Sequence, residues 1–275
     1  MRYLIILLLG LYISTGALAQ RTNPTAAEQA KSMKTYLGQH PSDEGYGVYH
    51  HEFNFGGTLN TNGWDGFLEY GIQKNNRITN LFQLEAGESK DTKEYKNPGN
   101  VYPVYQNGLV YTMTSRPYIF GKQNIFYHLN LNFGQRWMIG NKGNKNGVAV
   151  YAIYMGGLTL GIIRPYYLQL YTDSTGTSTA FEKYNPQDSA IFLNPGFIAG
   201  GSGLTKGWNE LSLNPGLQAK LAMRFDWAAY NDVVSAVEVG MRVQAYSRKV
   251  SIMAVNKPHQ LFLNAYVSVL FGKRW

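Results

Sequence analysis

Apolar and polar positions alternate with a period of two over most of the chain after Val48, the pattern of a strand with two different faces. In "VEVGMRVQAYS" at 237–247 the odd positions from 237 to 245 are apolar, and the even positions from 238 to 246 carry Glu, Gly, Arg, Gln and Tyr. The same alternation runs through "NIFYHLNLNFGQRW" at 124–137 and "LFLNAYVSVLFGKRW" at 261–275. The pattern predicts β-strands rather than helices.

Counting such segments predicts roughly eight strands, a number typical of small barrels. We place them near 48–59, 64–74, 77–88, 123–139, 147–171, 215–229, 232–247 and 259–272. The links "NNR", "NKGNK" and "YND" are short, whereas 89–122 and 172–214 are long and 248–258 is intermediate. Alternating short and long connections are typical of outer-membrane barrels. The sequence predicts an all-β fold, an antiparallel transmembrane β-barrel with short periplasmic turns and long extracellular loops.

In such a barrel the apolar face meets lipid and the charges face the lumen. Alternation then predicts a lumenal charge network of Glu52, Glu69, Glu85, Arg136, Lys220, Arg224, Asp226, Glu238 and Arg242. The interior of a barrel of about eight strands is only wide enough to be filled by side chains. Buried charges are costly unless paired, so we expect a salt-bridged plug in which Glu238 or Glu85 binds Arg224. A proton or ion path through these pairs and a catalytic role for them are the alternatives.

The first residues, "MRYLIILLLGLYISTGALAQ", have a basic start, an apolar stretch and an A-x-A motif before Gln20. These features predict a secretory signal peptide at 1–19. The polar residues 20–46 are expected to form a periplasmic segment, and 47–275 the barrel. The chain would therefore be an integral protein of the cell outer membrane, with both termini in the periplasm.

Charge and aromatic content change the expected partners. The net charge is +8, with 25 basic and 17 acidic side chains. For an exported chain this excess favours anionic lipopolysaccharide or phospholipid surfaces over nucleic acid. Trp137, Trp227 and Trp275 are predicted to anchor the barrel at the periplasmic interface, where membrane proteins place aromatic residues. The chain has no cysteine, which excludes disulfides and thiolate metal sites, and we predict neither a metal nor a cofactor.

Histidines are the main candidates for chemistry. Alternation places His50 and His128 toward the lumen, within reach of Glu52 or Glu85, and His51 toward lipid or the interface. Some eight-stranded outer-membrane enzymes remodel lipid A with a His and a Ser, chemistry that needs a nucleophile beside an oriented base. No nearby Ser has a recognisable signature, so satisfied lumenal histidines are the preferred interpretation. The glycine-rich stretches 140–147 and 200–210 do not match a phosphate-binding loop.

The chain resembles uncharacterised outer-membrane β-barrel proteins of Bacteroidetes-type bacteria. The resemblance runs through "HHEFNFGGTLNTNGWDGFLEYG", "FGKQNIFYHLNLNFGQ", "GNKGNKNGVAVYAIYMGGLTLGIIRPYYLQL", "GLTKGWNELSLNPGLQAK" and "LFLNAYVSVLFGKRW". It implies a small OmpA- or OmpX-like barrel and supplies no catalytic residues. We therefore predict a non-enzymatic structural or accessory subunit of an envelope complex for secretion or outer-membrane assembly. A lipid- or lipid A-modifying enzyme and a narrow small-solute pore are the alternatives.

Overall fold

The computed structural model describes residues 49–99, 101–106, 109–142, 147–173, 178–203, 205–228, 230 and 232–275. The chain divides into two units, and all the described residues lie in the second, 47–275. The signal peptide expected at 1–19 and the segment expected at 20–46 lie outside the described residues. Within the described ranges, no helix has the length and hydropathy needed to cross a membrane.

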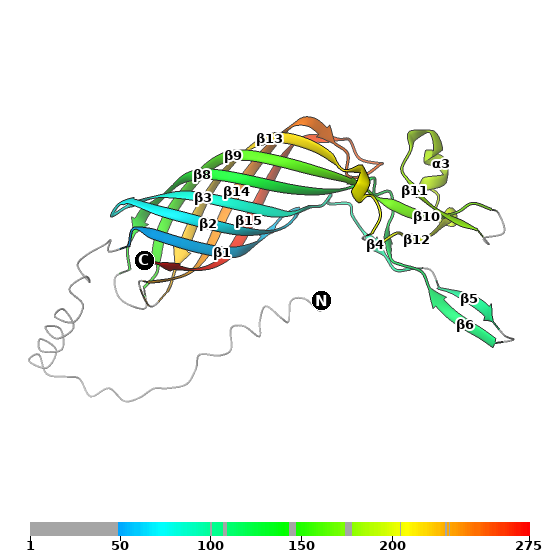
Figure 1. The fold of residues 1–275 in the computed structure, drawn as a ribbon, viewed down its shortest axis with the longest axis horizontal. Helices are drawn as coiled ribbons and strands as arrows, with labels where there is room; N and C mark the ends of the chain where they lie inside the picture. The colour runs from blue at the N-terminus through cyan, green and yellow to red at the C-terminus, as the bar shows by residue number, and fades with distance from the viewer. Residues whose placement is uncertain are drawn as a thin grey trace, which may run out of the picture. The chain divides into compact units, whose positions relative to one another are not determined.

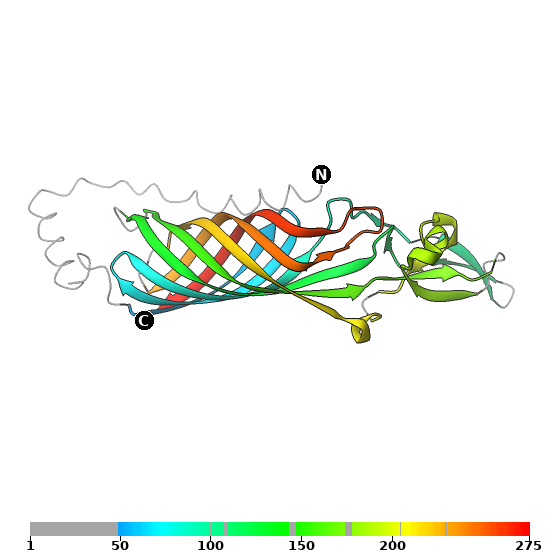
Figure 2. The same ribbon diagram turned by 90° about the horizontal axis from the view of Figure 1, so that it is seen from above.

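Eight strands of the second unit close into a single antiparallel ring (Figures 1 and 2). They are β1 (His51–Asn60), β2 (Gly63–Asn75), β3 (Ile78–Ser89), β8 (Asn124–Gly140), β9 (Ala149–Pro165), β13 (Ser212–Asp226), β14 (Val233–Val250) and β15 (His259–Arg274). Each pairs with its sequence neighbours among these eight, and β1 pairs with β15 to close the ring. Closure leaves none of the eight with an open edge. The predicted eight-stranded barrel is confirmed.

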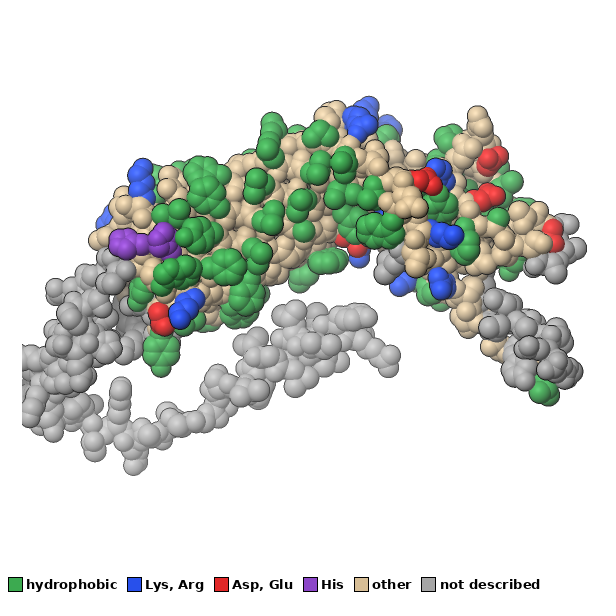
Figure 3. Space-filling view, viewed as in Figure 1, with side chains coloured by type: hydrophobic (Ala, Val, Ile, Leu, Met, Phe, Trp, Pro, Cys, Tyr) green, Lys and Arg blue, Asp and Glu red, His purple; other side chains and the backbone are tan. Residues whose placement is uncertain are grey.

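The two faces of the ring are chemically opposite. On β13, Leu221 is 66% exposed on the outside whereas its neighbour Lys220 is 2% exposed in the lumen. Large apolar side chains cover the outer face of the barrel, and Lys and Arg appear mainly near its ends (Figure 3). A soluble barrel would bury the apolar face, because apolar surface is driven out of water. The fold is therefore a transmembrane β-barrel with lipid outside and a polar interior.

The connections at one end of the barrel are short, whereas those at the other end are longer, apart from the two-residue link 61–62. At one end, the turn end, lie the C-terminus and the connections 76–77, 141–148 and 227–232. At the other, the loop end, lie 61–62, 90–123, 166–211 and 251–258. Most of the glycine-rich stretch 140–147 falls in a turn-end connection, with 143–146 outside the described residues.

The long connections contain secondary structure of their own beyond the loop end (Figures 1 and 2). One small sheet joins β10 (Tyr167–Tyr171), β11 (Thr179–Lys183) and β12 (Ile198–Gly201). Side chains of this sheet and of the segments beside it form a hydrophobic cluster of Tyr118, Leu168, Leu170, Phe192 and Ile198. Short helical turns flank it: η1 (Pro186–Asp188), α3 (Ser189–Phe192), η2 (Pro195–Phe197) and η3 (Trp208–Glu210). Two further pairs are β4 (Lys96–Asn97) with β7 (Tyr118–Ile119), and β5 (Val101–Gln106) with β6 (Leu109–Thr114).

One strand prediction is wrong in extent. The single strand expected at 147–171 is divided, because β9 ends at Pro165 and β10 belongs to the separate three-stranded sheet. Proline has no N–H to donate to a ladder, so it is found at strand ends and edges. The apolar positions of 167–171 continue the alternation of the barrel strands. They pack into the small core beyond the barrel, however, and do not face lipid.

Candidate functional site

The lumen holds most of the buried charges of the described chain. All nine residues of the predicted charge network are at most 5% exposed there. Alternation explains this placement, because successive side chains of a strand point to opposite faces. Lys220, Arg224 and Asp226 on β13 thus share the inner face, opposite the lipid-facing Leu221 and Met223.

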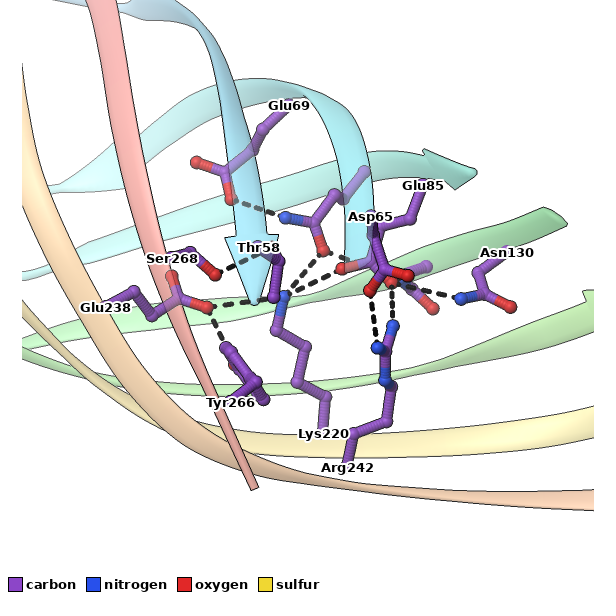
Figure 4. Close-up of polar contacts among 12 residues, drawn as sticks. Thr58, Asp65, Glu69, Glu85, Asn130, Lys220, Glu238, Arg242, Tyr266 and Ser268 are labelled. Atoms are coloured by element: carbon purple, nitrogen blue, oxygen red, sulfur yellow. Dashed lines mark hydrogen bonds and ion pairs between the residues drawn. The ribbon is translucent and has the colours of Figure 1, made fainter. Parts of the chain in front are cut away.

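Arg224 and Lys220 occupy the centre of the network. The Arg224 guanidinium donates to both carboxylate oxygens of Glu69 at 2.7 Å, and to Glu238 Oε2 at 2.7 and 3.0 Å. The Lys220 ammonium lies 3.0 Å from Glu85 and 3.3 Å from Glu238 (Figure 4). These contacts cross the lumen between distant strands, so they tie opposite walls of the barrel together.

We expected either Glu238 or Glu85 to bind Arg224. Glu85 does not bind this arginine. Lys220 and Arg242 hold Glu85 instead, each at 3.0 Å. Arg242 also donates to Asp65 Oδ2 at 2.5 Å. The reason is register, because Glu238 stands directly opposite Arg224 on the neighbouring strand, whereas Glu85 lies on β3 nearer the loop end.

A second group of ion pairs fills the turn end. Arg136 binds Glu52 through two nitrogens at 2.5 and 2.9 Å. Arg274 bridges Glu52 at 3.1 Å and Asp226 at 2.7 Å. The Lys142 ammonium lies 3.4 Å from the same Asp226 carboxylate. These pairs occupy the interior where the turns and the C-terminus meet.

Sequence reasoning missed three members of this network. Asp65 has the lumenal parity of Glu69 on the same strand, and Arg274 has that of Ser268, so alternation could have found both. Lys142 belongs to a turn, where alternation gives no signal. With these three, the described salt bridges of the lumen join two balanced sets. The six carboxylates are Glu52, Asp65, Glu69, Glu85, Asp226 and Glu238, and the six cations are Arg136, Lys142, Lys220, Arg224, Arg242 and Arg274.

At its loop end the lumen becomes apolar. We call the cluster there the apolar roof; it consists of Phe126, Tyr246, Val250, Ile252 and Met253. Phe262 packs against it, with its ring 5.6 Å from Phe126. The connection 251–258 is fastened over this end, because backbone N–H groups of Gln123 and Asn124 donate to the Ile252 carbonyl at 2.8 and 3.1 Å. The lumen is therefore filled by ion pairs together with buried apolar clusters around Leu81 and Leu270, and the apolar roof lies at its loop end.

Between the ion pairs and the roof, the structure brings Ser89, His128 and Asp65 together. Ser89 Oγ lies 3.1 Å from His128 Nδ1, and His128 Nε2 lies 2.7 Å from Asp65 Oδ1. The second contact is close but not aligned as an ideal hydrogen bond. All three side chains are 2% exposed. Alternation placed His128 in the lumen, but the grouping itself was not predicted, because it depends on how β2, β3 and β8 pair across a long connection.

Two further histidines, His50 and His51, and the three predicted anchor tryptophans lie at the turn end. His50 is exposed, so its predicted lumenal position is wrong; it precedes β1, where strand alternation does not apply. His51 faces outward, with Tyr70 Oη 2.9 Å from its Nδ1 and its ring 6.2 Å from that of Trp275. Trp137, Trp227 and Trp275 are 49%, 43% and 53% exposed. Their role as membrane anchors stays a prediction.

Outside the barrel, one polar cluster joins β10, β11 and η3. Tyr167 donates to Glu210 at 2.6 Å, and Lys183 binds the other oxygen of the same carboxylate. The hydrogen bond from Lys183 lowers the pKa of Glu210, and the bond to Glu210 raises the pKa of Tyr167. Such exposed pairs add little stability, and we assign this one no chemistry. Among the residues that the structure describes, no three His, Cys, Asp or Glu side chains are grouped to hold a metal ion.

Comparison with known proteins gives only distant likenesses. No protein-family model and no curated sequence matches the chain. Among solved structures, the attachment invasion locus protein Ail of Yersinia pestis is 9% identical with a TM-score of 0.37, covering 83% of this chain and 100% of Ail. Neisserial surface protein A is 9% identical with a TM-score of 0.38, covering 82% and 96%. The N-terminal β-barrel domain of Pseudomonas aeruginosa OprF is 9% identical with a TM-score of 0.32, covering 81% and 96%. The barrel assignment rests on strand pairing and burial, not on these likenesses.

The central network predicts which carboxylate is left without a cationic partner when Arg224 is removed. Removing one member of a buried pair costs roughly 3–5 kcal/mol, because it leaves an uncompensated charge. In Arg224→Met, Glu238 keeps Lys220 and a hydrogen bond from Tyr266 at 2.7 Å. Glu69 keeps only amide donors from Asn54 and Gln83 among the described residues. We expect Arg224→Met to destabilise the barrel and an added Glu69→Gln to restore more stability than an added Glu238→Gln.

Urea titration of the three proteins refolded in liposomes, followed by heat-modifiable gel migration, measures this order. The two double variants are matched, since each neutralises one partner of the same guanidinium. Equal recovery by both, or better recovery with Glu238→Gln, would contradict the pairing described for Arg224.

Proposed function

We propose that the chain is an outer-membrane barrel that does not conduct and that acts through the structures at its loop end. The observation that carries the proposal is the filled lumen. Six carboxylates and six cations pair inside the barrel, and the apolar roof closes above them. In the proposed orientation both termini and the short turns are periplasmic, and the long connections are extracellular.

The loop end supports a binding role because it offers structured, exposed and unpaired surface. Among the described residues, β5 and β6 pair only with each other, and an isolated two-stranded hairpin is marginally stable in water. Val101, Leu109 and Val110 on it are 66%, 59% and 61% exposed. An edge with free N–H and C=O groups beside exposed apolar side chains is a template for pairing with another chain.

We propose that this surface joins the barrel to a larger envelope complex, for secretion or outer-membrane assembly, as a structural or accessory subunit. Lipopolysaccharide and phospholipid are the proposed lipid partners, in keeping with the net charge of +8. The Bacteroidetes-type resemblance is part of the same proposal and rests on the quoted sequence segments alone. A small-solute pore is disfavoured by the paired charges in the lumen.

A filled lumen predicts electrical silence. Planar-bilayer recordings of the refolded protein should show no steady conductance above that of the empty bilayer, because ions would have to break buried pairs to pass. The same preparation must show heat-modifiable migration, which proves that the barrel is folded. A stable open channel formed by this folded protein would refute the sealed barrel and support the alternative of a small-solute pore.

The accessory role predicts a stoichiometric partner that depends on the β5–β6 hairpin. Extraction of the native membrane in mild detergent, followed by affinity purification of the tagged chain, should yield a complex larger than the barrel. Replacing residues 101–114 with a short Gly–Ser linker should release the partner while the barrel still folds, because β5 and β6 pair with no barrel strand. A complex that survives this replacement would place the binding surface elsewhere, and the absence of any complex would argue against the accessory role.

A further inference from the structure

We propose that Ser89, with His128 as base and Asp65 as positioning residue, is a nucleophile for carboxylic esters that carry an apolar acyl group. This goes beyond the sealed-barrel function, which needs no chemistry. The observation that carries it is the sequence of contacts Ser89 Oγ–His128 Nδ1 at 3.1 Å and His128 Nε2–Asp65 Oδ1 at 2.7 Å. A hydroxyl beside a base that a third group orients is the arrangement that activates a serine.

The roles follow from what each neighbour can donate. Asp65 accepts from Arg242 through Oδ2, and its other oxygen lies 2.7 Å from His128 Nε2. In the tautomer with the proton at Nε2, on the side of the carboxylate, the Nδ1 lone pair faces the Ser89 hydroxyl. The ion pairs of the lumen already balance six carboxylates with six cations, so the network does not require a charge on His128.

Gly87 makes the grouping possible. It stands directly between Asp65 and His128 in the sheet, paired with one on β2 and with the other on β8. A Cβ at this position would lie 2.1 Å from Asp65 Oδ1 and 2.2 Å from the Trp64 carbonyl oxygen. Only a residue without a side chain therefore lets the carboxylate and the imidazole meet across β3.

The surroundings select the substrate. Ser89 is paired with Phe126 of the apolar roof, so an acyl group bound at Ser89 would contact apolar and aromatic side chains. Ser89 is only 2% exposed. The structure therefore holds the site closed, and the proposed reaction requires the connection 251–258, whose Ile252 and Met253 pack with Phe126, to move away from Ser89.

The proposed reaction is balanced without a metal or redox partner. Ser89 Oγ forms a bond to the carbonyl carbon while its proton passes to His128. The bond from that carbon to the alkoxy oxygen then breaks, and His128 returns the proton to the departing oxygen, which leaves as an alcohol. Water, deprotonated by the same His128, releases the acyl group as a carboxylic acid and regenerates the hydroxyl.

A fluorophosphonate with an alkyl chain tests the nucleophile directly. Ser89 Oγ would form a bond to phosphorus and expel fluoride, leaving a stable adduct that peptide mass spectrometry locates. We expect the folded full-length protein in detergent to be labelled at Ser89 and Ser89→Ala to be unlabelled. We expect His128→Gln to slow labelling by roughly 10²-fold or more, the range of general-base contributions.

Ser268→Ala is the matched control. Ser268 is also a buried lumenal hydroxyl, paired with Thr58 at 2.8 Å and with no histidine, so its loss should leave labelling unchanged. Asp65→Asn should slow labelling, and Asp65→Glu should restore part of the rate, because the positioning role of residue 65 requires a carboxylate beside His128. Heat-modifiable migration must show that each variant is folded. A folded wild-type protein that takes no label, or a label that persists in Ser89→Ala, would overturn the proposal.

Discussion

Charge inside a membrane-spanning barrel must be neutralised locally, and the rest of this structure depends on that constraint. An unpaired ion in a water-poor interior costs several kcal/mol, and the interior of an eight-stranded barrel has room for side chains but little else. The lumenal carboxylates are accordingly bound by Lys and Arg from other strands, as Glu69 is by Arg224 and Glu85 by Lys220 and Arg242. The network fixes the walls relative to one another and occupies the route that a solute would take.

The filled interior accounts for the division of the molecule into a barrel and a structured loop end. The barrel has no room for a large ligand among its ion pairs, so recognition is left to the loop end, where the small sheet has its own hydrophobic cluster. At the loop end, the polar network of the lumen lies beneath the apolar roof. There the polar network ends in His128 and Ser89 instead of another ion pair.

Alternation made much of the fold predictable from the sequence. It assigned Lys220 to the lumen and Leu221 to the outside because a strand offers only two faces. It failed where a segment leaves the barrel, as at Pro165, since β10 is also apolar on one face but packs on a different core. It could not find the contact between Ser89 and His128, because the register of β3 against β8 is set after a long connection whose geometry the sequence does not encode locally. Parity gives the side on which a residue lies, but not its partner.

Cysteine accessibility tests the filled lumen most directly, and the chain has no cysteine of its own to interfere. Ala222→Cys places a thiol in the lumen, where Ala222 is 9% exposed, and Thr179→Cys places one on exposed β11 as the positive control. A charged, water-soluble thiosulfonate should modify Thr179→Cys rapidly and leave Ala222→Cys unmodified in the folded protein until denaturant opens the barrel. Modification of Ala222→Cys in the folded protein as fast as in the unfolded chain would contradict a lumen closed by its ion pairs.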